Sequence, residues 1–322
     1  MLIITCPCAL ALAIPAVQVV ATQALFRRSV LLHAPDALER LADVDTVVFD
    51  KTGTLTLPRP VLVNAEGLDP AVVAAAGRLA VASRHPLAQA VAEAAGKPAP
   101  VAGVREVAGA GVEADIAGVL ARLGSVAFCG AMEEGRQLAR LHPDASFIAY
   151  RHGDMVAVFA VEQVLRDDAK ATIAALHAAG LRTLILSGDR SDAVARAADV
   201  LGIAEMAGDL KPADKIARLD ALAAEGRKVL MVGDGLNDAP SLAAAHVSLS
   251  PVTAVHLAQA AADGVFLGDL LKPVSDSVRT ARIARKVMAQ NLWLAAVYNL
   301  IAVPLAIAGF VTPLIAALAM SG

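Results

Sequence analysis

The sequence predicts an α/β fold: a domain with a parallel sheet, a second domain inserted into it, and apolar helices on either side. Short β-branched runs alternate with Ala-rich helical patterns, and each run ends in a polar signature. Between about residues 62 and 159 the pattern changes to helices with short, Gly-punctuated strands. We therefore expect the two parts of the first domain at 29–61 and 160–286, with an α+β domain at 62–159 inserted between them.

The composition favours a protein that is partly embedded in a membrane. Hydrophobic residues make up 57% of the 322 residues and the mean hydropathy is +0.60, yet 18% of the residues are charged. Apolar and soluble stretches must therefore be segregated along the chain. The net charge is −3 and the 28 basic residues are spread out, which argues against a nucleic-acid partner.

Uncharged segments at both ends are interpreted as membrane helices in a lipid bilayer. Residues 1–26 and 287–322 carry no charge, and a basic cluster follows the first segment and precedes the second. The positive-inside tendency then makes the middle of the chain cytoplasmic in a multi-pass protein, expected in a bacterial inner membrane. A secretory signal is disfavoured because the basic residues follow the apolar run. We predict a partial helix at 1–26, a helix at 288–308, a turn near Gly309 to Pro313, and the start of a truncated helix at 312–322.

Three short runs are predicted to be buried parallel strands, Thr46 to Phe49, Thr183 to Leu186 and Val229 to Val232. In an open α/β sheet the chemistry belongs at the carboxyl ends of the strands. The polar signatures that follow these runs should therefore converge on one site.

The first signature is D-K-T-G-T-L-T, from Asp50 to Thr56. An Asp after a strand is commonly a turn or cap residue. A seven-residue motif at the end of a buried strand instead favours Asp50 as a nucleophile. The run resembles the phosphorylation signature of the P-type ATPases, within the haloacid dehalogenase-like superfamily.

This resemblance implies that Asp50 attacks the γ-phosphate of ATP, with Mg²⁺ offsetting the repulsion between the two anions. The third signature, G-D-G-L-N-D, supplies further ligands. Taken alone, G-D-G usually marks a turn. We assign the magnesium site to Asp50 and Asp234 and, by resemblance to the family, to Asn237 and Asp238.

The second signature and one lysine complete the predicted catalytic set. Ser187, Gly188 and Asp189 match the family element that binds the transferred phosphoryl group. Lys215, in K-P-A-D-K, resembles the lysine that pairs with its charge. Outside this context such a lysine would be a solvated surface residue.

Thr52 separates two types of reaction. Soluble phosphatases of the superfamily carry a second Asp two residues after the nucleophile, whereas a threonine hydroxyl does not titrate near neutral pH. The aspartyl phosphate should therefore persist, as a pump requires.

The inserted domain is predicted to bind ATP. Ser83 to Pro86 opens a helix and resembles an S-E-H-P element in which the histidine contacts the adenine end, although His-Pro is more often only a helix start. Arg84 departs from the glutamate of that element. Our predicted nucleotide-binding residues are His85, Pro86, Gly109, Gly111 and Gly124.

Cys6, Pro7 and Cys8 predict a site for a transported metal. Proline distorts the helix so that two thiols can approach one ion, and thiolates select Cu(I) or Zn(II). A single buried cysteine would be apolar filler. C-P-C marks the heavy-metal P-type ATPases, and Tyr298, Asn299 and Met320 resemble further ligands of the copper-transporting members. Since no carboxylate occurs in 287–322, copper is favoured over zinc.

By resemblance, the chain corresponds to the C-terminal catalytic portion of such a pump, without the actuator domain and the earlier helices. A cytoplasmic metallochaperone is expected to deliver the ion. Arg84 and the run Phe128, Cys129, Gly130 resemble the subgroup that serves cytochrome oxidase assembly. The alternatives are a Zn/Cd-type pump, a membrane-anchored phosphatase of the superfamily, and a non-catalytic metal-binding fragment.

Overall fold

The computed structural model describes residues 8–143, 145–234, 238–252 and 256–308. The chain divides into two compact units. Unit 1 consists of the described residues up to Leu55 and from Asp167 onward, and unit 2 is Thr56–Arg166. Unit 2 is a few residues wider at each end than the expected 62–159. The reason is that Thr56 forms a bridge with Leu165, so the two connecting segments run together as part of unit 2.

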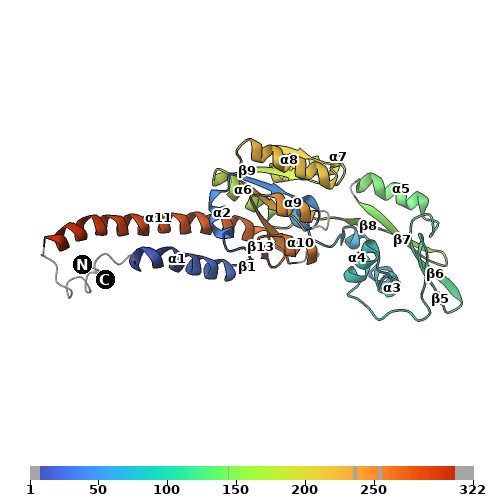
Figure 1. Ribbon diagram of the computed structural model, residues 1–322. Coiled ribbons are helices and arrows are strands. Elements are labelled where there is room, and N and C mark those ends of the chain that lie inside the picture. The colour runs from blue at the N-terminus through green and yellow to red at the C-terminus, as the bar shows by residue number, and fades with distance from the viewer. Residues whose placement is uncertain (1–7, 144, 235–237, 253–255, 309–322) are drawn as a thin grey trace. The chain divides into compact units, whose positions relative to one another are not determined.

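Unit 1 contains a seven-stranded sheet in the order β1-β13-β12-β11-β2-β9-β10 (Figure 1). Every pairing is parallel except that of β1 with β13. The strands are β1 (Val30–Leu32), β2 (Thr46–Phe49), β9 (Arg182–Leu186), β10 (Glu205–Ala207), β11 (Val229–Val232), β12 (Val247–Pro251) and β13 (Gly264–Phe266). The parallel α/β fold predicted from the sequence is confirmed, including the bounds of β2 and β11.

Strand β2 lies in the interior of the sheet between β11 and β9, and all four of its residues are buried. Continuous burial explains why its sequence, like that of β11, is apolar or β-branched throughout instead of alternating. Helices cover the sheet, for example α6 against β9 and α8 against β11. These helices are α2 (Ala37–Asp43), α6 (Ala169–Ala178), α7 (Ser191–Leu201), α8 (Pro212–Ala224), α9 (Ala239–Ala244) and α10 (His256–Ala261).

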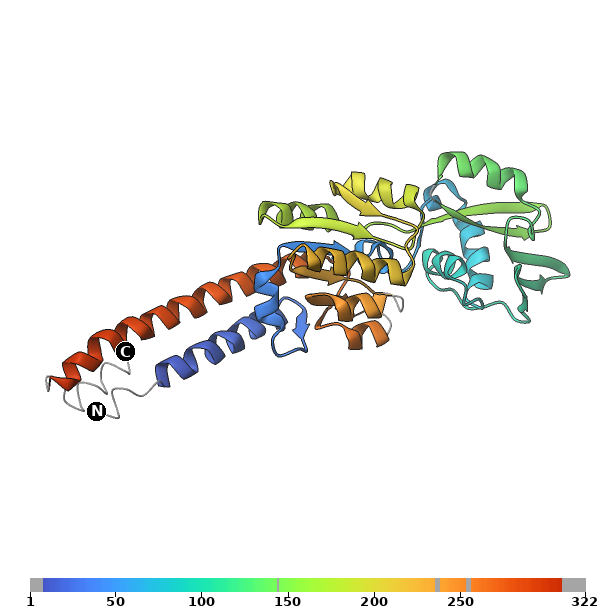
Figure 2. The same ribbon diagram turned by 45° about the horizontal axis from the view of Figure 1, so that its top comes forward.

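Two long helices extend from unit 1, α1 (Cys8–Phe26) and α11 (Lys272–Ile307), and they lie side by side in both views (Figures 1 and 2). The predicted helix at 288–308 is the second half of α11, which begins sixteen residues before it. The basic residues before 288 continue the helix, and Arg282 among them donates to the carbonyl of Ala179 at the end of α6. None of the helices in the described ranges has the length and apolarity required of a membrane span.

Unit 2 contains a six-stranded antiparallel sheet in the order β3-β8-β7-β6-β5-β4. The strands are β3 (Val61–Leu62), β4 (Arg105–Val107), β5 (Gly111–Ile116), β6 (Val119–Gly124), β7 (Ser146–His152) and β8 (Met155–Glu162). Its helices are α3 (Pro70–Ala80), α4 (Pro86–Ala94) and α5 (Met132–Leu141). Buried alanines of α3 and α4 allow both helices to pack closely on the sheet, around Phe159 and Tyr150.

Candidate active site

The predicted catalytic residues of unit 1 gather where three neighbouring parallel strands end. Asp50 follows β2, Ser187 follows β9 and Asp234 lies just beyond β11. The amide of Asp50 donates a hydrogen bond to the carbonyl of Val232 at 2.8 Å, which continues the sheet by one residue. The backbone therefore fixes the position of the Asp50 side chain.

Lys215 joins two carboxylates at the centre of the site. Its Nζ lies 2.6 Å from Oδ1 of Asp50 and 2.6 Å from Oδ1 of Asp238. All three side chains are buried, with 5%, 5% and 2% of Lys215, Asp50 and Asp238 exposed. Helix α8 supplies the lysine, and Pro212 at its first turn suits a helix start. The ammonium thus stands where it could neutralise a phosphoryl group attached to Asp50.

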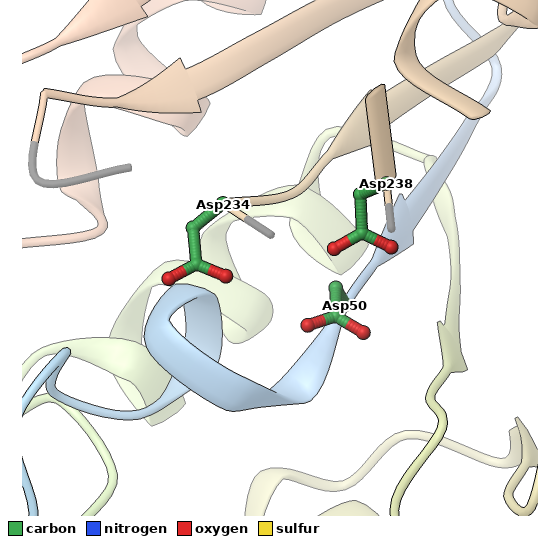
Figure 3. A group of neighbouring side chains, drawn as sticks. All are labelled: Asp50, Asp234 and Asp238. Atoms are coloured by element: carbon green, nitrogen blue, oxygen red, sulfur yellow. The ribbon is translucent and has the colours of Figure 1, made fainter. Parts of the chain in front are cut away.

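Three carboxylates form a group that fits a divalent cation. Asp50, Asp234 and Asp238 each offer one oxygen, and these oxygens lie within 4.8 Å of one another (Figure 3). Figure 3 shows Asp238 facing Asp50, with Asp234 over the turn that follows Asp50. Together with Lys215 they leave two negative charges, and oxygen ligands are those that Mg²⁺ prefers. When bound, Mg²⁺ would neutralise charge on the phosphates and on this cluster.

The electrostatics of the site favour binding of a cation. Burial, together with the neighbouring carboxylate of Asp238, raises the pKa of Asp50 to about 7, although Lys215 acts in the opposite direction. Burial disfavours the charge of Lys215, but Asp50 and Asp238 outweigh this effect and raise the pKa of Lys215. Lys215 therefore stays charged, and the carboxylates lack full compensation in the absence of a cation.

Gly53 provides room for Asp234 in the turn after Asp50. Its φ is +70°, and a Cβ built on it would lie 1.6 Å from Oδ2 of Asp234. Only glycine combines this backbone conformation with so close an approach. The G of the D-K-T-G-T motif is thereby explained by the cation site.

Replacing Gly53 with Ala should displace Asp234 and weaken Mg²⁺ binding. Because Mg²⁺ at a hundredfold its Kd would stabilise the folded chain by about 2.7 kcal/mol, the rise in melting temperature on adding Mg²⁺ measures the effect. We expect Gly53→Ala to lose most of this rise. Gly202→Ala is the matched control, since φ of Gly202 is +73° with nothing within 4 Å of its Cβ position. It should share a backbone strain of about 1 to 2 kcal/mol and keep the Mg²⁺ response; an equal loss in both variants would contradict this role of Gly53.

Asp189, at the end of β9, is hydrogen-bonded to the turn that follows Asp50. Its Oδ2 accepts hydrogen bonds from Lys51 Nζ at 2.6 Å and from Thr52 Oγ1 at 2.7 Å. Burial alone would raise the pKa of Asp189, but these bonds hold it below its usual range. Ser187 Oγ accepts from the amide of Asp189 at 3.2 Å. Asp189 thus positions the turn, and Thr52 offers a hydroxyl instead of a titratable group.

A cavity of about 320 Å³ opens onto these residues. Gly188 and Leu210 line it beside Asp50 and Lys215. The space suits a phosphoryl group approaching Asp50, because a carboxylate oxygen, an ammonium and the carboxylate cluster face it together.

Unit 2 has a pocket of about 340 Å³ that is lined by four of the five predicted nucleotide-binding residues. His85 is the N-cap of α4, and its Nδ1 accepts a hydrogen bond from the amide of Leu87 at 3.3 Å. Nε2 is then the protonated nitrogen of the neutral ring and is available as a donor. Pro86 opens α4 and does not line the pocket, whereas Gly109, Gly111 and Gly124 do.

The structure gives Gly111 and Gly124 a packing role. They face each other across β5 and β6. A Cβ on Gly111 would lie 2.2 Å from the carbonyl oxygen of Leu123, and a Cβ on Gly124 would lie 2.1 Å from that of Ala110. Gly109 has φ +70° and occupies a turn with open space around it. These glycines are therefore required by the local fold, irrespective of a nucleotide.

Gly124→Ala should accordingly destabilise unit 2 even without nucleotide, by about 1 to 3 kcal/mol. Gly67→Ala serves as the control, because nothing lies within 4 Å of its Cβ position and its φ is not positive. Urea unfolding without ATP measures both. Unchanged stability in Gly124→Ala, with weaker ATP binding alone, would assign this glycine to the nucleotide instead.

Comparison with known proteins yields one family. The family model for the haloacid dehalogenase-like hydrolases matches residues 44–246. Over its whole length the chain is 56% identical to the nitrogen fixation protein FixI of Bradyrhizobium diazoefficiens, of which it covers 44%. It is 35% identical to a copper-exporting P-type ATPase of Mycobacterium tuberculosis, with 99% of the chain and 43% of that protein covered. The solved structure of a zinc-transporting PIB-type ATPase in its E2.Pi state is similar, with a TM-score of 0.79 and 30% sequence identity. The match covers 99% of this chain and 54% of the chain in that structure.

The chain belongs to the haloacid dehalogenase-like hydrolases, and it is similar to the C-terminal catalytic part of P-type ATPases. It spans less than half the length of the curated relatives named above. The resemblance to the heavy-metal branch, inferred from the motifs, is thereby confirmed.

Several of the predicted metal ligands fall outside the described residues. These are Cys6, Asn237, Met320 and the side chain of Cys8. Tyr298 and Asn299 are half-buried neighbours on α11. Cys129, which contributed to the subgroup resemblance, is buried and donates to the carbonyl of Ala149 at 3.1 Å. Burial raises the pKa of its thiol to about 11, so it behaves as a packing residue.

Sequence reasoning missed some residues of both sites. Lys51 lies inside the phosphorylation motif, and its pairing with Asp189 could have been suspected from that position. Glu106, Ser125 and Phe147 line the unit 2 pocket. No motif marks them, because they come from separate strands and turns that only the fold brings together.

Proposed function

We propose that this chain forms the catalytic half of an ATP-driven heavy-metal pump and that Asp50 is the residue phosphorylated. The observation that carries the proposal is the cluster of Asp50, Lys215, Asp234 and Asp238 at the carboxyl ends of β2 and β11. A carboxylate with an ammonium and a cation site beside it is equipped to attack a phosphorus atom.

In the proposed reaction an oxygen of Asp50 bonds to the γ-phosphorus of ATP. The bond from that phosphorus to the β,γ-bridging oxygen breaks, and ADP leaves with the electron pair. Lys215 then faces the new phosphoryl group, and its position 2.6 Å from Asp50 allows it to neutralise charge without rearrangement. The unit 2 pocket would hold the base of ATP, since it is lined by apolar side chains such as Leu87 and Phe147.

The aspartyl phosphate should be long-lived because the position two residues after the nucleophile carries the Thr52 hydroxyl in place of an acid or base. The Thr52 hydroxyl donates to Asp189, which its partners keep ionised. This favours the pump over a membrane-anchored phosphatase, the second candidate. To test this, the chain is incubated with γ-labelled ATP and Mg²⁺ and the reaction is quenched with acid. We expect the chain to carry a label that hydroxylamine releases. Rapid, multiple turnover of p-nitrophenyl phosphate without any stable label would favour the phosphatase.

For the cargo we propose Cu(I), bound by Cys6 and Cys8 with Tyr298, Asn299 and Met320, and delivered by a cytoplasmic metallochaperone to a pump in the inner membrane. The support is the thiol-rich, carboxylate-free ligand set in the sequence and the copper-exporting relative. The similar zinc-transporting structure makes Zn(II) the alternative. Competition titrations with Cu(I) and Zn(II) chelators, on the wild type and on Cys6→Ala with Cys8→Ala, distinguish the two. Tighter Zn(II) binding that depends on the cysteines would reject copper.

A further inference from the structure

A groove in unit 1, lined by none of the residues of the candidate active site, lies between α6 and α11 and measures about 700 Å³. Its floor is apolar and includes Ala175, Leu176, Val278 and Ile283. The two helices run in the same direction and are fastened at both ends. At one end Asp168 accepts hydrogen bonds from the amides of Leu271 and Lys272 at 2.7 to 2.9 Å.

At the other end Arg282 donates to the carbonyl of Ala179, the C-cap of α6, at 2.8 Å and to that of Val44 at 2.9 Å. At both ends, therefore, the two helices are joined by hydrogen bonds between a charged side chain and backbone groups, with Asp168 at one end and Arg282 at the other. This makes the groove a preformed site.

Cationic side chains line the groove at the end where α11 leaves the body of unit 1. Arg279, Arg282 and Lys286 contribute to its wall. Arg279 is paired with Asp276 at 2.6 Å, and its side chain remains 60% exposed. Among the residues that the structure describes, Lys286 is exposed and takes part in no ion pair. An anionic group would thus find an uncompensated ammonium here.

An apolar stripe on α11 continues from these cations. Arg279, Lys286, Trp293 and Leu300 follow one another at intervals of seven residues, so each lies within about 20° of the previous one around the helix. Trp293 and Leu300 are 72% and 76% exposed. Each interval is about 10.5 Å along the axis. One surface therefore presents cations first and large apolar side chains beyond them.

We propose that this surface binds an anionic phospholipid, with the head group at Lys286 and Arg279 and an acyl chain along Trp293 and Leu300. Lys286 and Leu300 are about 21 Å apart, a length comparable to an extended acyl chain. Cationic pockets beside apolar helices select anionic head groups in this manner. The inference rests on the proposed function only in that it places α11 beside a bilayer.

Trp293 is the single tryptophan of the chain and serves as a native reporter. The full chain in a neutral detergent is titrated with phosphatidylglycerol or phosphatidylcholine that carry the same brominated acyl chains, and quenching of Trp293 is followed. We expect the anionic lipid to quench at a concentration roughly fivefold lower, the contribution of one cation near a lipid surface. Equal quenching by both lipids would overturn the site.

The variants separate a specific site from general electrostatic attraction. Lys286→Gln should remove the preference for the anionic lipid, and Lys286→Arg should keep it. Lys272→Gln is the matched control, because Lys272 lines the same groove but lies about 21 Å from Lys286 along α11. It should leave the preference unchanged; an equal loss in Lys272→Gln, or no loss in Lys286→Gln, would refute the proposal. Labelling of Asp50 by ATP, measured on the same samples, is expected to be unaffected and reports separately on the proposed function.

Discussion

Asp50→Asn should reduce labelling by γ-labelled ATP to background while the chain stays folded. The amide has nearly the same shape but cannot act as a nucleophile toward phosphorus. Since Asp50 is buried beside Asp238, removing its charge also relieves repulsion, so we expect no loss of stability. Acid-quenched labelling and thermal unfolding of the same preparation measure the two effects.

The control for this variant is Asp199→Asn, an exposed Asp on α7 that makes the same chemical change away from the site. It should label like the wild type. Substantial label on the Asp50→Asn variant would show that another residue accepts the phosphoryl group, and it would contradict the assignment of Asp50 as the nucleophile.

Lys215→Ala should cause the largest loss of stability of any single change in the site. Truncation leaves Asp50 and Asp238 buried without their shared cation, and breaking a buried ion pair on one side typically costs about 3 to 5 kcal/mol. Phosphorylation should fall as well, because the new phosphoryl group loses its counter-charge. Urea unfolding in the presence of EDTA measures the free energy of unfolding without a contribution from bound Mg²⁺.

Two further variants test the cause. Lys228→Ala, an exposed lysine, should change stability by no more than about 0.5 kcal/mol. Adding Asp50→Asn to Lys215→Ala should recover part of the loss, since one of the two unpaired carboxylates is then gone. If the double variant is as unstable as the sum of the single changes, the carboxylates are not the reason for the instability.

The parts of the fold that depend on local pattern could be predicted from the sequence. The strands β2 and β11 are continuous apolar or β-branched runs that end in polar motifs, and their bounds match the predicted ones. Their parallel pairing then brings Asp50 and Asp234 to the same edge of the sheet. The sequence order alone could not reveal that Lys215, on a helix between them, bridges Asp50 and Asp238.

Other features depended on tertiary contacts that leave no local signal. The basic residues before 288 were interpreted as the end of the soluble part, yet they belong to α11, which Asp168 caps at its start. Gly111 and Gly124 were interpreted through a nucleotide, whereas their strands approach too closely for a side chain. Asp168 is 104 residues away from Lys272 along the chain, and the close approach of Gly111 and Gly124 appears only once β5 and β6 have paired.

The most direct test of the central claim is to locate the phosphoryl group chemically. After incubation with ATP and Mg²⁺, the chain is treated with borohydride, which reduces an aspartyl phosphate to homoserine, and its peptides are sequenced by mass spectrometry. We predict homoserine at position 50 in the wild type and none at any position after omission of ATP. An unmodified Asp50, with the modification at another carboxylate or absent while ATP is being consumed, would contradict the proposed phosphorylation site.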